Sequence, residues 1–318
     1  MSFASGTALP PPDFEIASAF PEVTWLRQAA AAGDLEALRG YFHGLPPGTD
    51  QAFAVGVVGE VEGVEHALRA RVEAVPDDVL CLTLLGSRET EIGWAARTAA
   101  RAEHVSREQF AAFHGHLRTA EQYLIRATAL DPAADAAWAA RLNTARGLQL
   151  GQNEARRRYR QLAKHHPHHF TGQARLLQQL CPKWSGTWED AHGFARECML
   201  TAPEGALNGG LVAEVHLEHW LELDAGQQRA EYLRQPHVHT ELVESAGRSV
   251  AHPHFTRVPG WVVVEGTYAA LFSLMGDTAR AAHHFRALGN LASEYPWSYL
   301  GKPAEEYAKH RDAALARG

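Results

Sequence analysis

Histidines and tryptophans are the residues of this chain whose types and spacing could support chemistry. His216 and His219 lie three residues apart in the stretch GLVAEVHLEHWLEL, and Trp220 follows them directly. Residues three apart on a helix share a face, so the two imidazoles could bind a metal or act as an acid and base pair. The local sequence HLEH lacks the HExxH spacing of zinc proteases. We expect a helix with contacts on several sides, whose histidines form local hydrogen bonds or line a groove.

A second group of candidates surrounds the Ser-Gly turn in KWSGTWEDAHGFARECM. Lys183, Trp184 and Trp188 could form an aromatic wall with a cation that reaches an anion, because the N-terminus of the following helix also favours negative charge. The alternative is an elbow in which the two indole rings wedge two helices together. Thr187 can cap the second helix, with Asp190 at its N3 position. This pattern favours the elbow, and Lys183 and the two tryptophans remain binding candidates.

Other histidines gather in short clusters, most densely in HHPHH at residues 165–169. Neutral imidazole binds zinc, copper and nickel, so such a tract could hold a metal. The cluster falls at a predicted turn between helices, where adjacent side chains diverge and a tetrahedral site is hard to form. We predict a solvated turn there, and the sequence indicates neither a metal site nor a cofactor.

Signals for familiar enzyme chemistry are missing from the sequence. It contains no G-x-S-x-G nucleophile motif, no G-x-x-x-x-G-K-[ST] phosphate loop, and no G-x-G-x-x-G leading from a strand into a helix. Cys81, Cys181 and Cys198 form no CxxC pair, which indicates reduced thiols. Cys181 and Cys198 also fall on predicted core positions, where thiols are inert. We name no catalytic residue and favour a protein that is not an enzyme.

Charge and hydropathy argue against two classes of partner. The formal net charge is −7 with both signs interspersed, so the basic surface of a nucleic-acid binder is not expected. The arginines of residues 146–160 spread around their helix, which predicts a solvated face with Glu154 pairing locally. No stretch has the pattern of a secretory signal or the apolar length of a membrane span. These features favour a cytoplasmic protein that binds neither nucleic acid nor membrane.

Helical periodicity dominates the chain after a proline-rich start. Residues 1–22 contain four prolines, which predicts a flexible N-terminal arm. The short run Trp261–Val264 could be a strand or a buried helix segment. A last helix is expected near residues 303–316. Before it, we expect helical pairs at about 23–45, 50–75, 79–131, 134–166, 171–202, 208–235, 238–256 and 262–295.

Proline spacing points to an internal repeat. Successive prolines in the second half of the chain are 35, 36 and 33 residues apart, close to the 34-residue period of helix–turn–helix repeats. Ala155 and Tyr159 precede one of these prolines at the spacing A-x3-F…P, and Ala191 holds the same place before the next. A small residue lets two helices approach, and an aromatic residue one turn later fills the space beside it. The prolines are Pro132, Pro167, Pro203 and Pro236.

In these residues the chain resembles the tetratricopeptide-repeat (TPR-like) proteins. The early half of their consensus, W-x2-L-G-x2-Y, is less well kept, since Trp138 stands one place early. Over about residues 120–300 the chain also resembles uncharacterised bacterial TPR-like families, in which a K-W-x-G-S/T turn precedes an F-A-R helix. The resemblance implies an all-α fold, a TPR-like α-solenoid of stacked antiparallel helix pairs, in a single domain over residues 23–318.

Two hypotheses about function follow from this resemblance. The first is a helical-repeat binding module whose concave groove holds a peptide or protein partner. The second is a small-molecule binder or enzyme on the same scaffold, with the His, Trp and Lys residues of the segment 183–220 around an enclosed pocket. A fold does not fix a function, so the sequence leaves both open.

Overall fold

The computed structural model describes residues 9–46, 49–98 and 104–318, which lie mostly in helices and the turns that join them. Within these ranges there is no strand, and a single isolated bridge joins Asp13 to Leu291. The all-α prediction is therefore confirmed for the described part of the chain. The run Trp261–Val264 begins helix α15 (Trp261–Met275), so its strand alternative is wrong. Most of α15 is buried, and a uniformly apolar helix shows no periodicity in its sequence.

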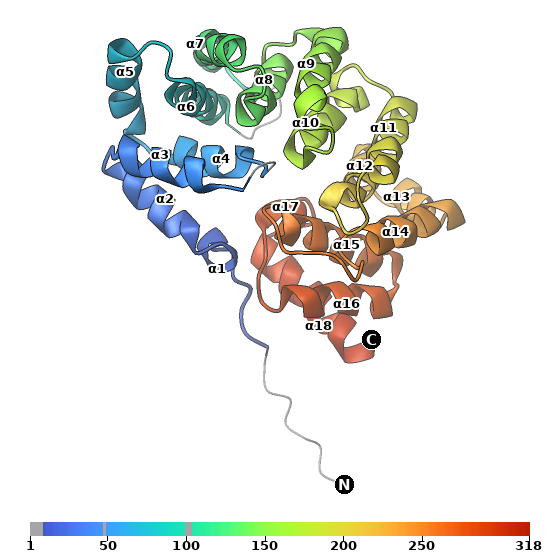
Figure 1. The fold of residues 1–318 in the computed structure, drawn as a ribbon. Helices are drawn as coiled ribbons and strands as arrows, with labels where there is room; N and C mark the ends of the chain where they lie inside the picture. Colours follow the sequence, from blue (N-terminus) through green and yellow to red (C-terminus); the bar gives the residue numbers. More distant parts are fainter. Residues whose placement is uncertain (1–8, 47–48, 99–103) are drawn as a thin grey trace. The chain divides into compact units, whose positions relative to one another are not determined.

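The described chain divides into two compact units, each of which is considered by itself (Figure 1). The N-terminal unit comprises residues 21–194, and the C-terminal unit comprises residues 195–318 together with residues 9–20. Repeats contact mainly their sequence neighbours, so a continuous repeat domain can also divide in this way. A single domain over residues 23–318 therefore stays a prediction.

In the N-terminal unit, the helices lie close to the predicted bounds, and α2–α3, α6–α7 and α8–α9 pack as pairs, whereas α5 packs on α6. Helices α4, α6 and α8 contact one another, and α8 also contacts α10. Helix α5 packs on α6, α7 on α6 and α8, and α9 on α8 and α10, so the odd-numbered helices cover the even-numbered row. The helices are α2 (Glu22–Ala31), α3 (Leu35–Gly44), α4 (Ala52–Glu60), α5 (Val64–Ala74), α6 (Val79–Arg97), α7 (Arg107–Leu130), α8 (Asp135–Gly147), α9 (Gly151–His165) and α10 (Phe170–Leu180). Helix α11 (Trp188–Thr201) spans the division between the units.

A proline lies in each connection from an odd-numbered helix to the next even-numbered one between α3 and α10. Proline ends a helix and biases the preceding residue away from helical dihedrals, and the α5–α6, α7–α8 and α9–α10 connections are short turns of four residues each. Polar side chains cap two of the helices that follow: Asp78 accepts from the Cys81 amide of α6 at 3.2 Å, and His169 accepts from the Gly172 amide of α10 at 3.0 Å. The prolines are Pro46, Pro76, Pro132 and Pro167.

Buried charges cross the interior of the N-terminal unit. The Glu121 carboxylate accepts hydrogen bonds from Arg141 at 2.8 Å and from Arg158 at 2.6 Å. The side chain of Arg158 is only 3% exposed, so the predicted solvated face of α9 is wrong at this position. The predicted local pairing of Glu154 is confirmed, since it accepts hydrogen bonds from both Arg157 and Arg158. A sequence window shows which residues share a helix face, but not that a partner carboxylate lies on another helix.

The C-terminal unit has a different core, built largely from aromatic rings. Phe285 stacks on Trp297 with ring centroids 5.8 Å apart, and the edge of Tyr307 meets Phe285 at 5.3 Å. The predicted last helix is confirmed as α18. The helices are α1 (Ile16–Ala19), α12 (Gly210–Glu222), α13 (Gln227–Leu233), α14 (Pro236–Arg248), α15, α16 (Thr278–Leu288), α17 (Glu294–Trp297) and α18 (Pro303–Arg317).

One predicted helical pair of this unit is wrong. The segment 238–256 holds only the main part of α14, and an irregular stretch without helix follows up to Gly260. Pro253 cannot donate to a helical ladder, and Gly260 has a positive φ of 96°. These two residues account for the interruption.

Residues 1–8 of the predicted N-terminal arm lie outside the described residues. In the part that follows, the Asp13 amide donates to the carbonyl of Asn290 at 2.7 Å, and Arg311 donates to the carbonyl of Pro10 at 2.7 Å. This segment therefore joins the C-terminal unit through its backbone. Among the described residues, no helix is both long enough and apolar enough to cross a membrane.

Candidate functional site

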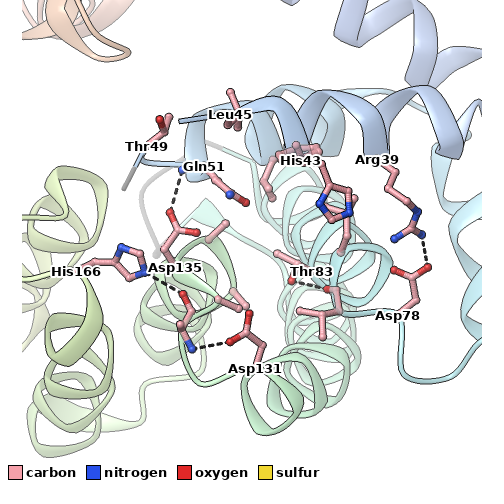
Figure 2. Close-up of a pocket in the computed structure, with 18 of the residues that line it drawn as sticks. Arg39, His43, Leu45, Thr49, Gln51, Asp78, Thr83, Asp131, Asp135 and His166 are labelled. Carbon is pink, nitrogen blue, oxygen red and sulfur yellow. Dashed lines mark hydrogen bonds and ion pairs between the residues drawn. The ribbon is translucent and has the colours of Figure 1, made fainter. Parts of the chain in front are cut away.

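An open pocket of about 500 Å³ lies at the edge of the N-terminal unit where the proline-containing turns gather (Figure 2). Helix α3 and residues just after it form one wall of this edge pocket, and the α5–α6 and α7–α8 turns face them. His166, from the α9–α10 turn, lines one end. The apolar part of the lining includes Phe42, Leu45, Val55, Val75, Val79 and Leu80.

Asp78 anchors one side of the edge pocket. Its carboxylate accepts hydrogen bonds from Arg39 at 2.5 Å and Arg71 at 2.9 Å, and it also caps α6. Burial raises the pKa of Asp78, but the two arginines and the helix amide outweigh this effect, so its pKa lies below the usual range. The charge is therefore compensated within the protein, and the three side chains hold α3 against the α5–α6 turn.

A cluster of Asp50, Asp135 and His169 holds the other side of the edge pocket. The Nε2 atom of His169 lies 3.1 Å from a carboxylate oxygen of each aspartate. Asp135 also accepts from the Gln51 amide at 2.9 Å, and Asp50 accepts from the Thr171 hydroxyl at 2.6 Å. The cluster thereby ties the segment before α4 to the starts of α8 and α10.

This cluster has the composition of a metal site, since all three ligand atoms lie within 4.8 Å of one another. Its hydrogen bonds fit a different role. The Nδ1 atom of His169 accepts a hydrogen bond from the Gly172 amide. In the neutral ring the proton therefore sits on Nε2, which then has no lone pair to offer a metal. Metal-bound histidines normally donate from the second ring nitrogen. The donor set therefore suits a hydrogen-bonded clasp better than a metal centre.

Electrostatics within the cluster favour charged forms. Burial lowers the pKa of His169, but hydrogen bonds and charges from Asp135 and Asp50 outweigh it and raise the pKa to about 9. The Gly172 amide opposes this change, because the second proton must sit on Nδ1. Burial raises the pKa of Asp50, yet His169 and Thr171 together bring it down to about 2. The cluster therefore contributes most to stability between about pH 4 and 6.5, and its contribution falls as the pH rises through 9 or drops through 2.

Two side chains of the edge pocket have hydrogen-bonding capacity to spare. His43 on α3 and Gln51 just before α4 both line the pocket (Figure 2). Within the described residues neither side-chain group is hydrogen-bonded to the protein, whereas the Thr83 hydroxyl donates to the Val79 carbonyl at 2.8 Å. His43 and Gln51 can therefore donate to and accept from a ligand.

The predicted elbow residues lie in the N-terminal unit, outside the lining of the edge pocket. Lys183 is exposed, Trp184 is half-buried with Arg146 5.6 Å from its ring, and Trp188 is the first residue of α11. The predicted cap is present, since Thr187 accepts from the Asp190 amide at 3.1 Å. A ligand role for Lys183, Trp184 and Trp188 stays a prediction.

The turn at the elbow is tight. A Cβ atom at Gly186 would lie 1.8 Å from the Leu180 carbonyl oxygen, so only glycine fits there. The Cys181 carbonyl accepts from the Trp184 amide at 2.9 Å and from the Gly186 amide at 3.2 Å. These contacts fold the elbow back on the end of α10.

The other predicted site residues lie in the C-terminal unit. His216 is 1% exposed and is hydrogen-bonded to the Tyr232 hydroxyl at 2.7 Å and to Glu241 at 2.9 Å. His219 packs on the Tyr232 ring at 4.5 Å, and burial together with His216 lowers its pKa to about 4. Trp220 is buried with Arg229 4.6 Å from its ring. His216 is thus hydrogen-bonded to side chains of α13 and α14, partners that lie outside its own helix, and a ligand role for the three residues stays a prediction.

The residues of the edge pocket were missed by the sequence analysis, and the prediction of a solvated HHPHH turn is wrong at His169, which is 6% exposed. Its two aspartate partners lie 34 and 119 residues earlier in the chain, beyond any local window. One signal was available. An aspartate or histidine follows the turn proline by two or three residues in Pro76–Asp78, Pro132–Asp135 and Pro167–His169.

Comparison with known proteins adds no assignment for these sites. No model of a known protein family matches the sequence. A search of curated proteins likewise finds no match. The function must therefore be argued from the geometry.

Proposed function

We propose that this chain is a TPR-like helical-repeat binding module that holds a segment of a peptide or protein partner, and that the edge pocket receives that segment. The observation that carries the proposal is the open pocket of about 500 Å³, whose walls come from successive helix pairs. Repeat proteins bind along surfaces to which each repeat contributes a few residues. The period of the prolines and the two rows of helices in the N-terminal unit support the same assignment.

The chemistry of the lining favours binding over catalysis. The charges of Asp78 and Asp135 are compensated by arginines and by His169, so they position the walls. The apolar lining can bury a side chain of the partner, while His43 and Gln51 can pair with its backbone or polar groups. Cys81 lies near the pocket on α6, but burial and Asp78 raise its pKa to about 12, which leaves it a poor nucleophile.

A peptide display experiment tests this proposal. A random peptide library is selected against the full chain, and synthetic copies of enriched peptides are measured by fluorescence polarisation. Ala133→Trp should weaken binding at least tenfold, because Ala133 is exposed and lines the pocket, where an indole would fill the space. Ala129→Trp is the matched control, since Ala129 is exposed on α7 away from the lining. Absence of enrichment, or equal binding by Ala133→Trp, would contradict the proposal.

The pocket volume also suits a small molecule, because ligand pockets usually measure about 300–1,000 Å³. A ligand of this kind would raise the melting temperature of the wild type, by an amount that grows with the logarithm of its concentration above Kd. A panel of small metabolites screened by thermal shift, with Ala133→Trp and Ala129→Trp in parallel, tests this second candidate. Stabilisation that Ala133→Trp abolishes, without peptide enrichment, would favour it over the peptide.

A further inference from the structure

A second surface pocket, of about 450 Å³, lies over α6 between α5 and α7, and we refer to it as the α5–α7 pocket. It shares no lining residue with the edge pocket. Three ionisable side chains, one from each helix, meet there. The lining residues are Arg69, Glu89, Ala112, Gly115, His116 and Thr119.

A buried carboxylate organises the α5–α7 pocket. The Glu89 side chain is 3% exposed, and its two oxygens have different partners: Arg69 at 2.5 Å and the Nδ1 atom of His116 at 2.8 Å. Because an unpaired carboxylate at this depth would be costly, the contacts to Arg69 and His116 compensate the burial of Glu89. Glu89 therefore engages Nδ1 of His116 and leaves the opposite nitrogen, Nε2, available.

The position of His116 is fixed by helix packing as well as by this bond. A Cβ atom placed on Gly93 would lie 3.2 Å from the Cβ of His116, so the absence of a side chain at Gly93 lets α7 approach α6 there. Glu89 lies one turn before Gly93 on α6. The imidazole is thus held over α6 with its side chain still 36% exposed.

We propose that the α5–α7 pocket binds a tetrahedral oxyanion, such as a phosphate group, between Arg69 and His116. Arg69 is 41% exposed, and its guanidinium has more N–H donors than the single contact to Glu89 uses. Protonated His116 adds a second donor through Nε2. Glu89 compensates one of these two positive charges, so the site is neutral with neutral His116 and carries one positive charge when His116 is protonated. Oxyanion binding and protonation of His116 are therefore coupled.

Other ionisable groups near the pocket do not replace this pair. Glu65 and Tyr123 both act on Arg69 and raise its pKa further, and the Glu65 carboxylate is bound to Arg88 at 2.9 Å. These groups keep Arg69 positively charged throughout the neutral range. Within the lining, His116 is the side chain that gains a second N–H donor when it is protonated.

Sulfate is the probe for this site, because its charge does not change between pH 6 and 8. Sulfate is titrated into the full chain at low ionic strength at both pH values, with the ring signals of His116 followed by NMR and the affinity measured by calorimetry. We expect binding about tenfold tighter at pH 6 than at pH 8, together with a higher apparent pKa of His116 when sulfate is bound. Inorganic phosphate should compete with sulfate, and acetate should compete more weakly. Absence of binding, or binding without a response of His116, would overturn the proposal.

Variants separate the site from general charge effects. His116→Gln should remove the pH dependence and weaken sulfate binding at least tenfold. Arg69→Gln should also weaken sulfate binding at least tenfold. Arg118→Gln, on the exposed face of α7, should bind sulfate like the wild type. Because the first two changes also disturb the buried Glu89, Gly115 provides a gentler pair. A Cβ at Gly115 meets nothing within 4 Å, so Gly115→Ala should bind normally and Gly115→Glu should repel the anion. Equal affinities of these two variants would refute the site.

Discussion

The interiors of the two units are filled by different chemistry. In the N-terminal unit, Glu121 holds two buried arginines from α8 and α9. In the C-terminal unit, a run of aromatic rings that includes Phe285, Trp297 and Tyr307 fills the core. Buried ion pairs add little net stability but require exact geometry, whereas aromatic burial stabilises with less demand on position. We refer to Glu121, Arg141 and Arg158 as the ionic core. We infer that it fixes the register of α7, α8 and α9, and hence the positions of the turns around the edge pocket.

The same contrast appears among the buried histidines. His169 in the N-terminal unit lies between Asp50 and Asp135, which come from distant turns. His284 in the C-terminal unit bonds Glu265 at 2.5 Å and stacks on Tyr268, all within the α15–α16 pair. The first histidine joins separate helix pairs, and the second fastens a single pair. The His169 cluster therefore shapes the edge pocket through contacts between helix pairs, while the His284 contacts stabilise one helix pair of the C-terminal unit.

The largest effect is expected from breaking the ionic core. Glu121→Gln keeps the shape of the side chain but leaves Arg141 and Arg158 without their shared charge, which should lower the free energy of unfolding by about 3 kcal/mol. Urea denaturation followed by circular dichroism measures this loss. Arg157→Gln is the control, since Arg157 is exposed and pairs only with Glu154 in the described hydrogen bonds. A loss under about 1 kcal/mol for Glu121→Gln would show that the ionic core does not hold the helices.

Raising the pH should lower the contribution of the Asp50–His169–Asp135 cluster to the free energy of unfolding by about 1–3 kcal/mol. Since the pKa of His169 is raised to about 9, its contribution is complete below pH 6.5 and is lost as the pH rises through 9. The lowered pKa of Asp50 implies a second loss only as the pH falls from about 4 through 2. Urea unfolding at pH 6 and pH 9.5, compared between the wild type and His169→Asn, isolates the histidine because asparagine keeps the helix cap. An identical pH response of the two proteins would contradict the assignment.

A smaller effect is expected in the aromatic core. Tyr307→Phe retains the packing against Phe285 but loses the hydroxyl that donates to the Leu291 carbonyl at 3.0 Å. The free energy of unfolding should fall by about 0.5–1.5 kcal/mol. Thermal denaturation measures the change. A loss as large as that of Glu121→Gln would mean that polar contacts matter equally in both units.

The smallest effect is expected at the surface. Lys302 and Glu305 pair at 2.8 Å with side chains 80% and 69% exposed. Lys302→Ala should change the free energy of unfolding by less than about 0.5 kcal/mol, because water screens the pair. The same urea titration checks this value, and a larger loss would show that exposed pairs in this protein cannot be neglected beside the buried ones.

The sequence determined the helical elements and many of their ends. Alanine and leucine periodicity placed most helices, and local rules identified the Thr187 cap, the buried thiols and the Glu154 pairs, because each depends on residues within one or two turns. The Trp261–Val264 run and the break after α14 were not resolved, since a buried helix has no period and a single proline does not reveal how far an interruption extends.

Only the tertiary structure decided where the charged residues meet. The sequence predicts a surface position for Arg158, but its guanidinium contacts Glu121 of α7. The sequence predicts a solvated turn at His169, but its imidazole contacts both Asp50 and Asp135. In the same way, Arg69, Glu89 and His116 come from three helices and have no recognisable spacing. Hydrophobic patterning is a property of each helix, whereas the pairing of buried charges depends on which helices become neighbours. For that reason the sequence predicted the fold class, and the packing of helices created both pockets.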